Sequence, residues 1–272
     1  MTAPAPSTFL GVTPIALASG GRRAARLLER NVLVYRRQWV YLVSGFFEPL
    51  FYLLSIGVGL NHLVGAVHAG GRPVAYASYV APGLLAAAAM NGALFDATFG
   101  MFFKLKIAKT FEAVLATPLG ARDVVVGELA WALLRGSLYA ASFVVVMAAL
   151  GYLHSAWALL SLPAAVLVSG SFGAIGMAAT SYMRSWQDFD LVSLGMLPLF
   201  LFSATFYPLS VYPGWLQLVV RCTPLYQGVA LQRGLCLGGV SWMLAAHAAY
   251  LLVMGGIGFA VTSGRLARLL LS

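Results

Sequence analysis

The chain has 272 residues, of which 61% are hydrophobic and only 9% are charged. Because soluble domains usually carry about 25% charged residues, this composition, with a mean hydropathy of +0.87, excludes a soluble globular protein and indicates a polytopic membrane protein. The net charge of +9 does not indicate a nucleic-acid partner, since the basic residues lie at the ends of apolar segments, where they anchor and orient a membrane chain.

The N-terminal part divides into two segments of different composition. Residues 1–21 are rich in Pro, Ala and Ser, and we expect them to form a disordered leader without a cleavable signal peptide. In residues 22–39 arginines alternate with apolar residues, which predicts an amphipathic helix lying in the anionic membrane interface. A plain juxtamembrane anchor is equally consistent with this pattern.

The remaining residues, 40–272, predict an all-α transmembrane domain of six spans. The spans are expected over residues 43–63, 78–103, 124–150, 156–182, 191–207 and 242–262. Span four is rich in Gly, Ala and Ser, which allows close helix packing in lipid. Residues 210–239 are apolar but interrupted by prolines and glycines, so we expect two short re-entrant helices at the outer face there.

The distribution of basic residues predicts the orientation of the chain. Six spans place both termini on one side of the membrane, and that side carries thirteen basic residues, against three (Arg72, Arg221 and Arg233) on the other. The thirteen are Arg22, Arg23, Arg26, Arg30, Arg36, Arg37, Lys104, Lys106, Lys109, Arg122, Arg184, Arg265 and Arg268. Because cytoplasmic loops are enriched in Lys and Arg, we expect a multi-pass protein of the cytoplasmic membrane with both termini in the cytoplasm.

A short charged stretch between spans two and three, Lys104 to Leu119, has the pattern of a one-sided helix. Ile107, Phe111, Val114 and Leu115 fall at i, i+4, i+7 and i+8, and Pro118 ends the pattern. An apolar stripe on such a helix needs a covering surface. We expect either the lipid interface or a soluble partner to provide it.

Four residues that are charged at pH 7 lie within the predicted spans: Glu48, Asp96, Glu128 and Arg135. Charges at this depth are costly, so they are candidates for gating or for polar contacts between helices; local hydrogen bonds near the membrane boundary are the alternative. Glu128 and Arg135 share a face two turns apart, too far for a direct i,i+4 pair. Cys222 and Cys236 are expected to be free thiols, although a disulfide on an oxidising side stays open.

Motifs for catalysis are absent from the sequence. It contains no GxxxxGK[ST], no HExxH, no GxSxG and no cluster of His and Cys with metal-ligand spacing, so we expect neither a nucleotide site nor a metal site in this chain. An enzyme, such as a membrane-embedded lipid-modifying one, therefore has little support. An ATP-independent secondary transporter or channel remains the main alternative, and it would need an ion-binding carboxylate at the midplane, for which Asp96 is the candidate.

Several motifs taken together resemble one family. The run Phe111 to Leu119, FEAVLATPL, followed by Gly127 to Ala132, GELAWA, is similar to the E-x-x-x-x-T-P coupling helix region in permease subunits of type-2 ABC exporters. Glu48-Pro49-Leu50, Phe202-Ser203-Ala204 with Pro208, and Thr223-Pro224-Leu225-Tyr226 with Arg233 resemble further elements of that family, which commonly has Gly at position 204. Within the family the chain is most similar to permeases that export nodulation lipo-chitooligosaccharides and to daunorubicin-resistance permeases.

This resemblance implies the permease half of an ATP-driven exporter for an amphiphilic substrate, such as a glycolipid, a lipid-linked saccharide or a hydrophobic drug. The expected partners are two copies of a separate ABC ATPase subunit, which would bind ATP and Mg, and a second copy of this permease or a homologous one. ATPase coupling would fall to Ile107, Phe111, Glu112, Val114, Leu115, Thr117 and Pro118. Spans one, two and five would line the path between the two copies, with Phe47, Phe51, Phe95, Phe202 and Phe206 as candidate substrate contacts.

Overall fold

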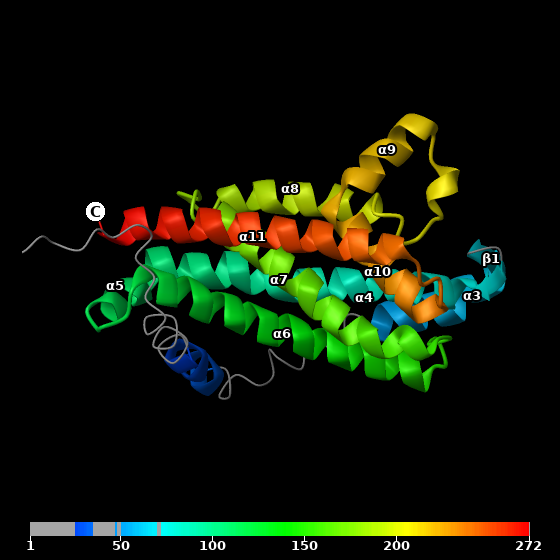
Figure 1. Ribbon diagram of the computed structural model, residues 1–272, viewed down its shortest axis with the longest axis horizontal. Coiled ribbons are helices and arrows are strands. Elements are labelled where there is room, and N and C mark those ends of the chain that lie inside the picture. The colour runs from blue at the N-terminus through cyan, green and yellow to red at the C-terminus, as the bar shows by residue number, and fades with distance from the viewer. Residues whose placement is uncertain (1–24, 35–46, 48–49, 70–71, 272) are drawn as a thin grey trace, which may run out of the picture.

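The computed structural model describes residues 25–34, 47, 50–69 and 72–271, and nearly all of them are helical (Figure 1). After a helix over residues 25–34, the main elements are the helical run 50–55 with its continuation Ile56–Leu60 and α3 Asn61–Val64, strands β1 Ala66–Ala69 and β2 Arg72–Ala75, α4 Tyr76–Phe95 with its continuation to Ile107, α5 Thr110–Leu115, α6 Ala121–Ala149, η4 Ala156–Leu160, α7 Ser161–Thr180, α8 Asp188–Leu201, α9 Gly214–Cys222, α10 Pro224–Leu237 and α11 Trp242–Leu271.

Long helices run side by side along one axis, which gives the bundle two distinct ends. Within the described residues, four helical runs are long and apolar enough to cross a membrane: Tyr76–Ile107, Ala121–Ala149, Ala156–Thr180 and Trp242–Leu269. Figure 1 shows α5 and the C-terminal end of α11 at one end of the bundle, and the β1–β2 hairpin with α3 at the other. The chain is therefore a membrane-spanning helical bundle.

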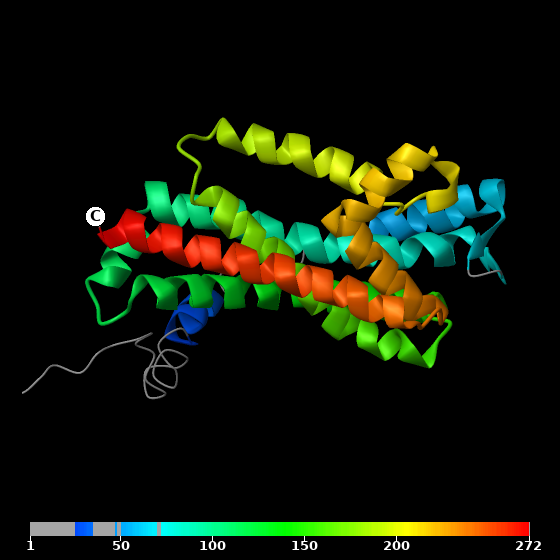
Figure 2. The same ribbon diagram turned by 45° about the horizontal axis from the view of Figure 1, so that its top comes forward.

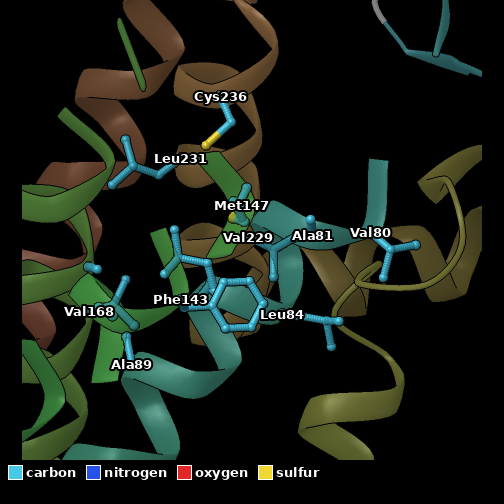
Figure 3. Packing of buried hydrophobic residues seen from close by; sticks show 14 of the residues in the cluster. Val80, Ala81, Leu84, Ala89, Phe143, Met147, Val168, Val229, Leu231 and Cys236 are labelled. Carbon is cyan, nitrogen blue, oxygen red and sulfur yellow. The ribbon is translucent and has the colours of Figure 1, made fainter. Parts of the chain in front are cut away.

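Helix α4 is the centre of this bundle. The apolar core contains Val80 and Leu84 of α4, Phe143 of α6, Val168 of α7 and Val229 of α10. Figure 3 shows side chains of this cluster, with the Phe143 ring near the middle of the view. Residues on all sides of α4 are buried, as expected for a helix inside a membrane bundle.

Small residues bring α7 into close contact with its neighbours. Ser169 Oγ donates a hydrogen bond to Ala89 O of α4 (3.0 Å), and Ser171 Oγ donates one to Leu251 O of α11 (2.7 Å). A Cβ added at Gly258 of α11 would lie 2.7 Å from the backbone carbonyl carbon of Ala174, so only glycine allows this approach. Hydrogen bonds from Ser hydroxyls and close backbone contact are the forces that join helices where lipid removes the hydrophobic drive.

The structure corrects the sequence predictions at three places. The all-α prediction contained no strands, whereas the link between spans one and two contains an antiparallel hairpin in which Val67 pairs with Val74. The fifth helix ends at Leu201 instead of Tyr207, because the chain bends from residue 202 onward. The third correction, at Lys109, concerns the predicted coupling helix and is described with the site.

The segment 210–239 forms the short helices α9 and α10, but α10 packs inside the bundle. Its Gln232 is fully buried and donates a hydrogen bond to Ser161 O at 2.9 Å. Cys222 at the end of α9 is exposed, Cys236 of α10 is buried, and both are free thiols.

Candidate functional site

The stretch between spans two and three forms an elbow and not one continuous helix. The long run from α4 continues to Ile107, and Lys109 then adopts a left-handed backbone with φ 47° before α5 begins at Thr110. Left-handed residues interrupt a right-handed helix. The predicted apolar stripe is therefore divided, with Ile107 on one arm and Phe111, Val114 and Leu115 on the other.

Most of the elbow's apolar stripe is covered by this chain itself. Phe111 is 1% exposed and belongs to a cluster with Leu27 of the N-terminal helix, Val124 of α6, Met177 of α7 and Leu266 of α11. Val114 packs against the same cluster, and Leu115 is half-buried. The expectation that lipid or a soluble partner covers these residues is wrong for Phe111, because the chain's own helices cover it. The apolar pattern indicated that a covering surface is needed but not which surface provides it.

The other predicted coupling residues form the outer surface of the elbow. Ile107, Glu112, Thr117 and Pro118 are exposed. Glu112 makes only a loose ion pair with Lys109, at 3.7 Å. These exposed side chains leave the tip of the elbow available to a partner at the end of the bundle where α5 and the C-terminus lie.

Glu128 lies at a junction of three segments. Its carboxylate accepts a hydrogen bond from Lys104 Nζ at 2.6 Å and one from Asn31 Nδ2 at 3.3 Å, and Lys104 Nζ also donates to Asn31 Oδ1 at 3.2 Å. Asn31 is on the helix over residues 25–34, Lys104 on the end of the α4 run and Glu128 on α6. This network joins the N-terminal helix to the end of the α4 run and to α6, the two segments that flank the elbow. Lys104 and Asn31 were not predicted as partners of Glu128.

A second polar cluster lies deeper between α4 and α6. Arg135 Nη1 donates to Asp96 Oδ1 at 2.6 Å, while Arg135 Nε and Nη2 donate to the Tyr139 hydroxyl at 3.1 and 3.0 Å. Asp96 begins a π-helical turn, Asp96–Gly100, and such turns are frequent at functional sites. Glu48, the remaining ionisable residue predicted in a span, lies outside the described residues.

A cavity of about 610 Å³ adjoins this second cluster, between α4, α6 and α8. Arg135 and Tyr139 form part of its wall, and Phe95 and Phe99 of the α4 run stack at a centroid distance of 5.2 Å along it. Phe99 in turn stacks on Phe189 of α8 at 4.1 Å. The cavity therefore combines a charged pair with a row of aromatic faces.

The predicted substrate contacts are not gathered in one place. Phe95 lines the cavity, whereas Phe47, Phe51, Phe202 and Phe206 are not among its lining residues. Phe47, Phe51 and Phe202 are exposed, and Phe206 stacks edge-on against Phe200. Aromatic composition could not distinguish these surroundings.

The bend after α8 is held by a half-buried arginine that the sequence did not identify as structural. Arg233 of α10 donates to the backbone oxygens of Tyr79, Ala204 and Thr205 at 3.3, 3.0 and 3.2 Å, and its guanidinium lies 3.8 Å from the centroid of the Tyr79 ring. Ala204 has a left-handed backbone with φ 56°. This conformation costs a residue with a Cβ about 1–2 kcal/mol, a cost that glycine, which the family resemblance implies at position 204, would avoid.

The loop between α7 and α8 lies at the elbow's end of the bundle. The Asp188 carboxylate accepts hydrogen bonds from the backbone N–H groups of Arg184 and Ser185 at 2.6 and 3.1 Å. These two hydrogen bonds lower the pKa of the Asp188 carboxyl below its ordinary value. They fix the start of α8, whose first turn carries Phe189 to the cavity wall.

The described residues contain no group of three His, Cys, Asp or Glu side chains placed to hold a metal ion. The charged clusters are instead paired between helices, as is typical of polar residues in membrane bundles.

Comparisons with known proteins agree with this architecture. The sequence profile of the family described as ABC-2 type transporter matches residues 24–237. Nodulation protein J of Rhizobium leguminosarum bv. trifolii is 32% identical over 96% of this chain and 99% of its own length. The proteins of the same name from Rhizobium leguminosarum bv. viciae and Rhizobium meliloti (strain 1021) are 30% and 29% identical, each over 94% of this chain and over 98% and 97% of their own lengths. The chain therefore belongs to the ABC-2 type transporter family, as a membrane-embedded permease.

Proposed function

We propose that this protein is the permease of an ATP-driven exporter that moves an amphiphilic substrate across the cytoplasmic membrane, with ATP and Mg bound by a separate ATPase subunit. Family membership supports a partner of this kind. We further propose a six-span topology with both termini in the cytoplasm, two permease copies side by side and two ATPase subunits beneath them. The excess of basic residues on the side of the membrane predicted to hold both termini and the elbow supports this orientation.

The observation that carries the proposal is the construction of the elbow. Its inner side is anchored in the bundle through Phe111, while Ile107, Glu112 and Thr117 remain exposed at the tip. An ATPase that moved this tip would push directly on the ends of the α4 run and α6. A short helix that is rigidly backed and exposed on one edge can transmit such movement, because close-packed interiors transmit displacement.

The competing function, an ATP-independent carrier, needs a carboxylate that exchanges a proton or a sodium ion at the midplane. Asp96 is held in a 2.6 Å ion pair with Arg135, so an exchanging ion would have to displace a partner that the carboxylate already has. This arrangement favours the exporter.

The test is the activity of the partner ATPase reconstituted with the full-length permease. Phe111 is unsuitable for substitution, because a charge at that buried position would disturb the fold itself. We instead propose the double variant Ile107→Asp, Glu112→Lys at the exposed tip. The Lys109–Glu112 ion pair that this variant removes is exposed and contributes little stability, so the chain should remain folded.

We expect the double variant to lose permease-dependent stimulation of ATP hydrolysis and co-purification of the ATPase. Asp190→Lys is the control for the charge reversal at Glu112, since it also replaces an exposed carboxylate by a lysine near the same end of the bundle, on α8. Equal loss in the control would contradict a role specific to the elbow. Transport by the wild-type permease in the absence of any ATPase would overturn the exporter.

A further inference from the structure

The cavity between α4, α6 and α8 lies within one chain, at the middle depth of the bundle. Helix α8 stands apart from α4 in Figure 2. The residues that line the cavity come mainly from the α4 run, α6 and α8. Apolar and aromatic side chains form most of the wall, including Leu84, Phe143 and Leu197. A volume of about 610 Å³ is in the range of about 300–1,000 Å³ that is usual for small-molecule sites.

Asn91 is the notable polar group in this wall. It lies midway along the helical run Tyr76–Ile107, and its side chain is half-buried. Within the described part of the chain, no residue forms a hydrogen bond with the Asn91 amide. An amide without a hydrogen-bond partner in an apolar environment costs about 1–3 kcal/mol. A side chain with two donors and one acceptor oxygen facing this cavity therefore points to a ligand that bears hydrogen-bonding groups.

The charges beside Asn91 indicate which kind of ligand fits. Arg135 is 7% and Asp96 is 5% exposed, and the two form an ion pair, so this pair adds no net charge to the wall. A free anion or cation would gain little attraction from such a pair and would lose its hydration. Uncharged hydroxyl or amide groups can instead exchange hydrogen bonds with Asn91 and with Ser193, an exposed residue of α8 on the same cavity.

The aromatic faces of the wall complete the site. Phe95, Phe99 and Phe189 stack in sequence at centroid distances of 5.2 and 4.1 Å. Such rings offer broad flat apolar surfaces next to the amide. They suit the apolar face of a ring or an alkyl chain attached to the polar group.

We propose that this intra-chain cavity binds an amphiphile with an uncharged, hydroxyl- or amide-bearing head, which Asn91 recognises by hydrogen bonding while the aromatic row holds the adjoining apolar part. The inference rests on the proposed function, because it assigns a substrate class to the exporter. It assigns substrate contact to named residues of α4 and α8, which belong to two of the spans expected to line the path between the copies.

The test uses the full-length permease in lipid nanodiscs without an ATPase, and it measures the thermal unfolding midpoint. The probes are decyl maltoside, decyl sulfate and decyltrimethylammonium, which share one alkyl chain and differ in head charge. A ligand that binds only the folded state raises the midpoint in proportion to its affinity. We expect decyl maltoside to raise it more than either charged probe.

Three variants locate the site. Asn91→Leu should weaken the apparent affinity for decyl maltoside about five- to tenfold, the effect of one lost hydrogen bond, while Asn91→Gln should retain most of it. Ala88→Trp should abolish the response by filling the cavity, since Ala88 lines it. Ser142→Leu on α6 removes a polar side chain outside the cavity and should respond like the wild type.

An equal response of the wild type and Asn91→Leu, or a stronger response to decyl sulfate, would overturn the proposal. Should Asn91→Leu fail to fold, the contrast between the three probes on the wild type and on Asn91→Gln decides.

A resident bilayer lipid could present the same chemistry as cargo. Lipid extracted from the purified wild type but not from Ala88→Trp, and not displaced by decyl maltoside, would identify such a lipid and overturn the assignment to cargo. Loss of ATPase coupling at the elbow would leave all these binding results unchanged, so the two proposals can fail separately.

Discussion

Two ion pairs of the same length join the α4 run to α6. In one pair the α4 run carries the negative charge, and in the other it carries the positive charge. Asp96 pairs with Arg135 at 2.6 Å, and Lys104 pairs with Glu128 at 2.6 Å. The two helices run in opposite directions, so a slide of about two turns one way would bring Asp96 toward Glu128, and the same slide the other way would bring Lys104 toward Arg135. Such like-charge contacts are unfavourable, and the alternation therefore specifies one register of α4 against α6.

The surroundings of the two pairs differ more than their geometry. The Asp96–Arg135 pair lies at the middle of the bundle beside an apolar, aromatic cavity. The Lys104–Glu128 pair lies near the elbow and shares its hydrogen bonds with Asn31 of the N-terminal helix. The first pair should accordingly be costly to break and insensitive to solvent, whereas the second is a junction between segments that can adjust when one member is lost.

The largest effect is expected from Arg135→Met. The substitution leaves the Asp96 carboxylate deep in the bundle without its ion pair, and breaking a buried pair in this way costs about 3–5 kcal/mol. We expect a sharp fall in the thermal unfolding midpoint and in the yield of folded protein. The double variant Asp96→Leu, Arg135→Met removes both charges and should recover most of the loss. A double variant as unstable as the single one would show that the pair's other contacts dominate.

The sequence could predict those features of this arrangement that belong to a single helix, but not the contacts between two helices. The depth of Asp96, Glu128 and Arg135 followed from hydropathy, and the shared face of Glu128 and Arg135 followed from their spacing. Their partners did not, because partner choice depends on the register between α4 and α6, which no pattern within a single helix contains. Tyr139 was nevertheless within reach of prediction, since it lies one turn after Arg135.

The elbow shows a different limit. The apolar spacing around Phe111 correctly indicated that a surface must cover this residue. A helical pattern does not indicate which surface does so, and here it is the chain's own bundle. The break at Lys109 could not be predicted, because lysine is a good helix former and residues with a Cβ rarely adopt a left-handed backbone. Ala204 is a similar case, since only the contacts of Arg233 with the bend reveal why a positive φ is held there.

A smaller effect is expected from breaking the second pair. Glu128→Gln removes the carboxylate that accepts from both Lys104 and Asn31, but Lys104 is 14% exposed and close to the end of the bundle, where its long side chain can reach water. We expect a loss of about 1–3 kcal/mol, less than for Arg135→Met. Exchanging the charges, Lys104→Glu with Glu128→Lys, should restore stability, because the Asn31 amide both donates and accepts. The comparison of the two pairs would be wrong if Glu128→Gln were the more damaging substitution.

Asn31→Leu tests the junction without removing a charge. Asn31 is 2% exposed and bridges Lys104 and Glu128, so its loss should cost about 1 kcal/mol and loosen the N-terminal helix selectively. The measurement is the rate of trypsin cleavage after Arg26 and Arg30, which should rise while the thermal midpoint changes little. Unchanged cleavage would indicate that Leu27, packed in the cluster around Phe111, holds this helix on its own.

The smallest effect expected is the response to salt. The Debye length falls from about 10 Å at 0.1 M to about 3 Å at 1 M ionic strength, so charges near solvent are screened and buried charges are not. The difference in unfolding midpoint between the wild type and Glu128→Gln should therefore shrink at 1 M salt, by an amount equivalent to less than about 1 kcal/mol. The difference between the wild type and Arg135→Met should stay constant over the same range. If both differences shrank together, water and ions would have access to the Asp96–Arg135 pair, and the adjoining cavity would be an aqueous passage instead of an apolar one.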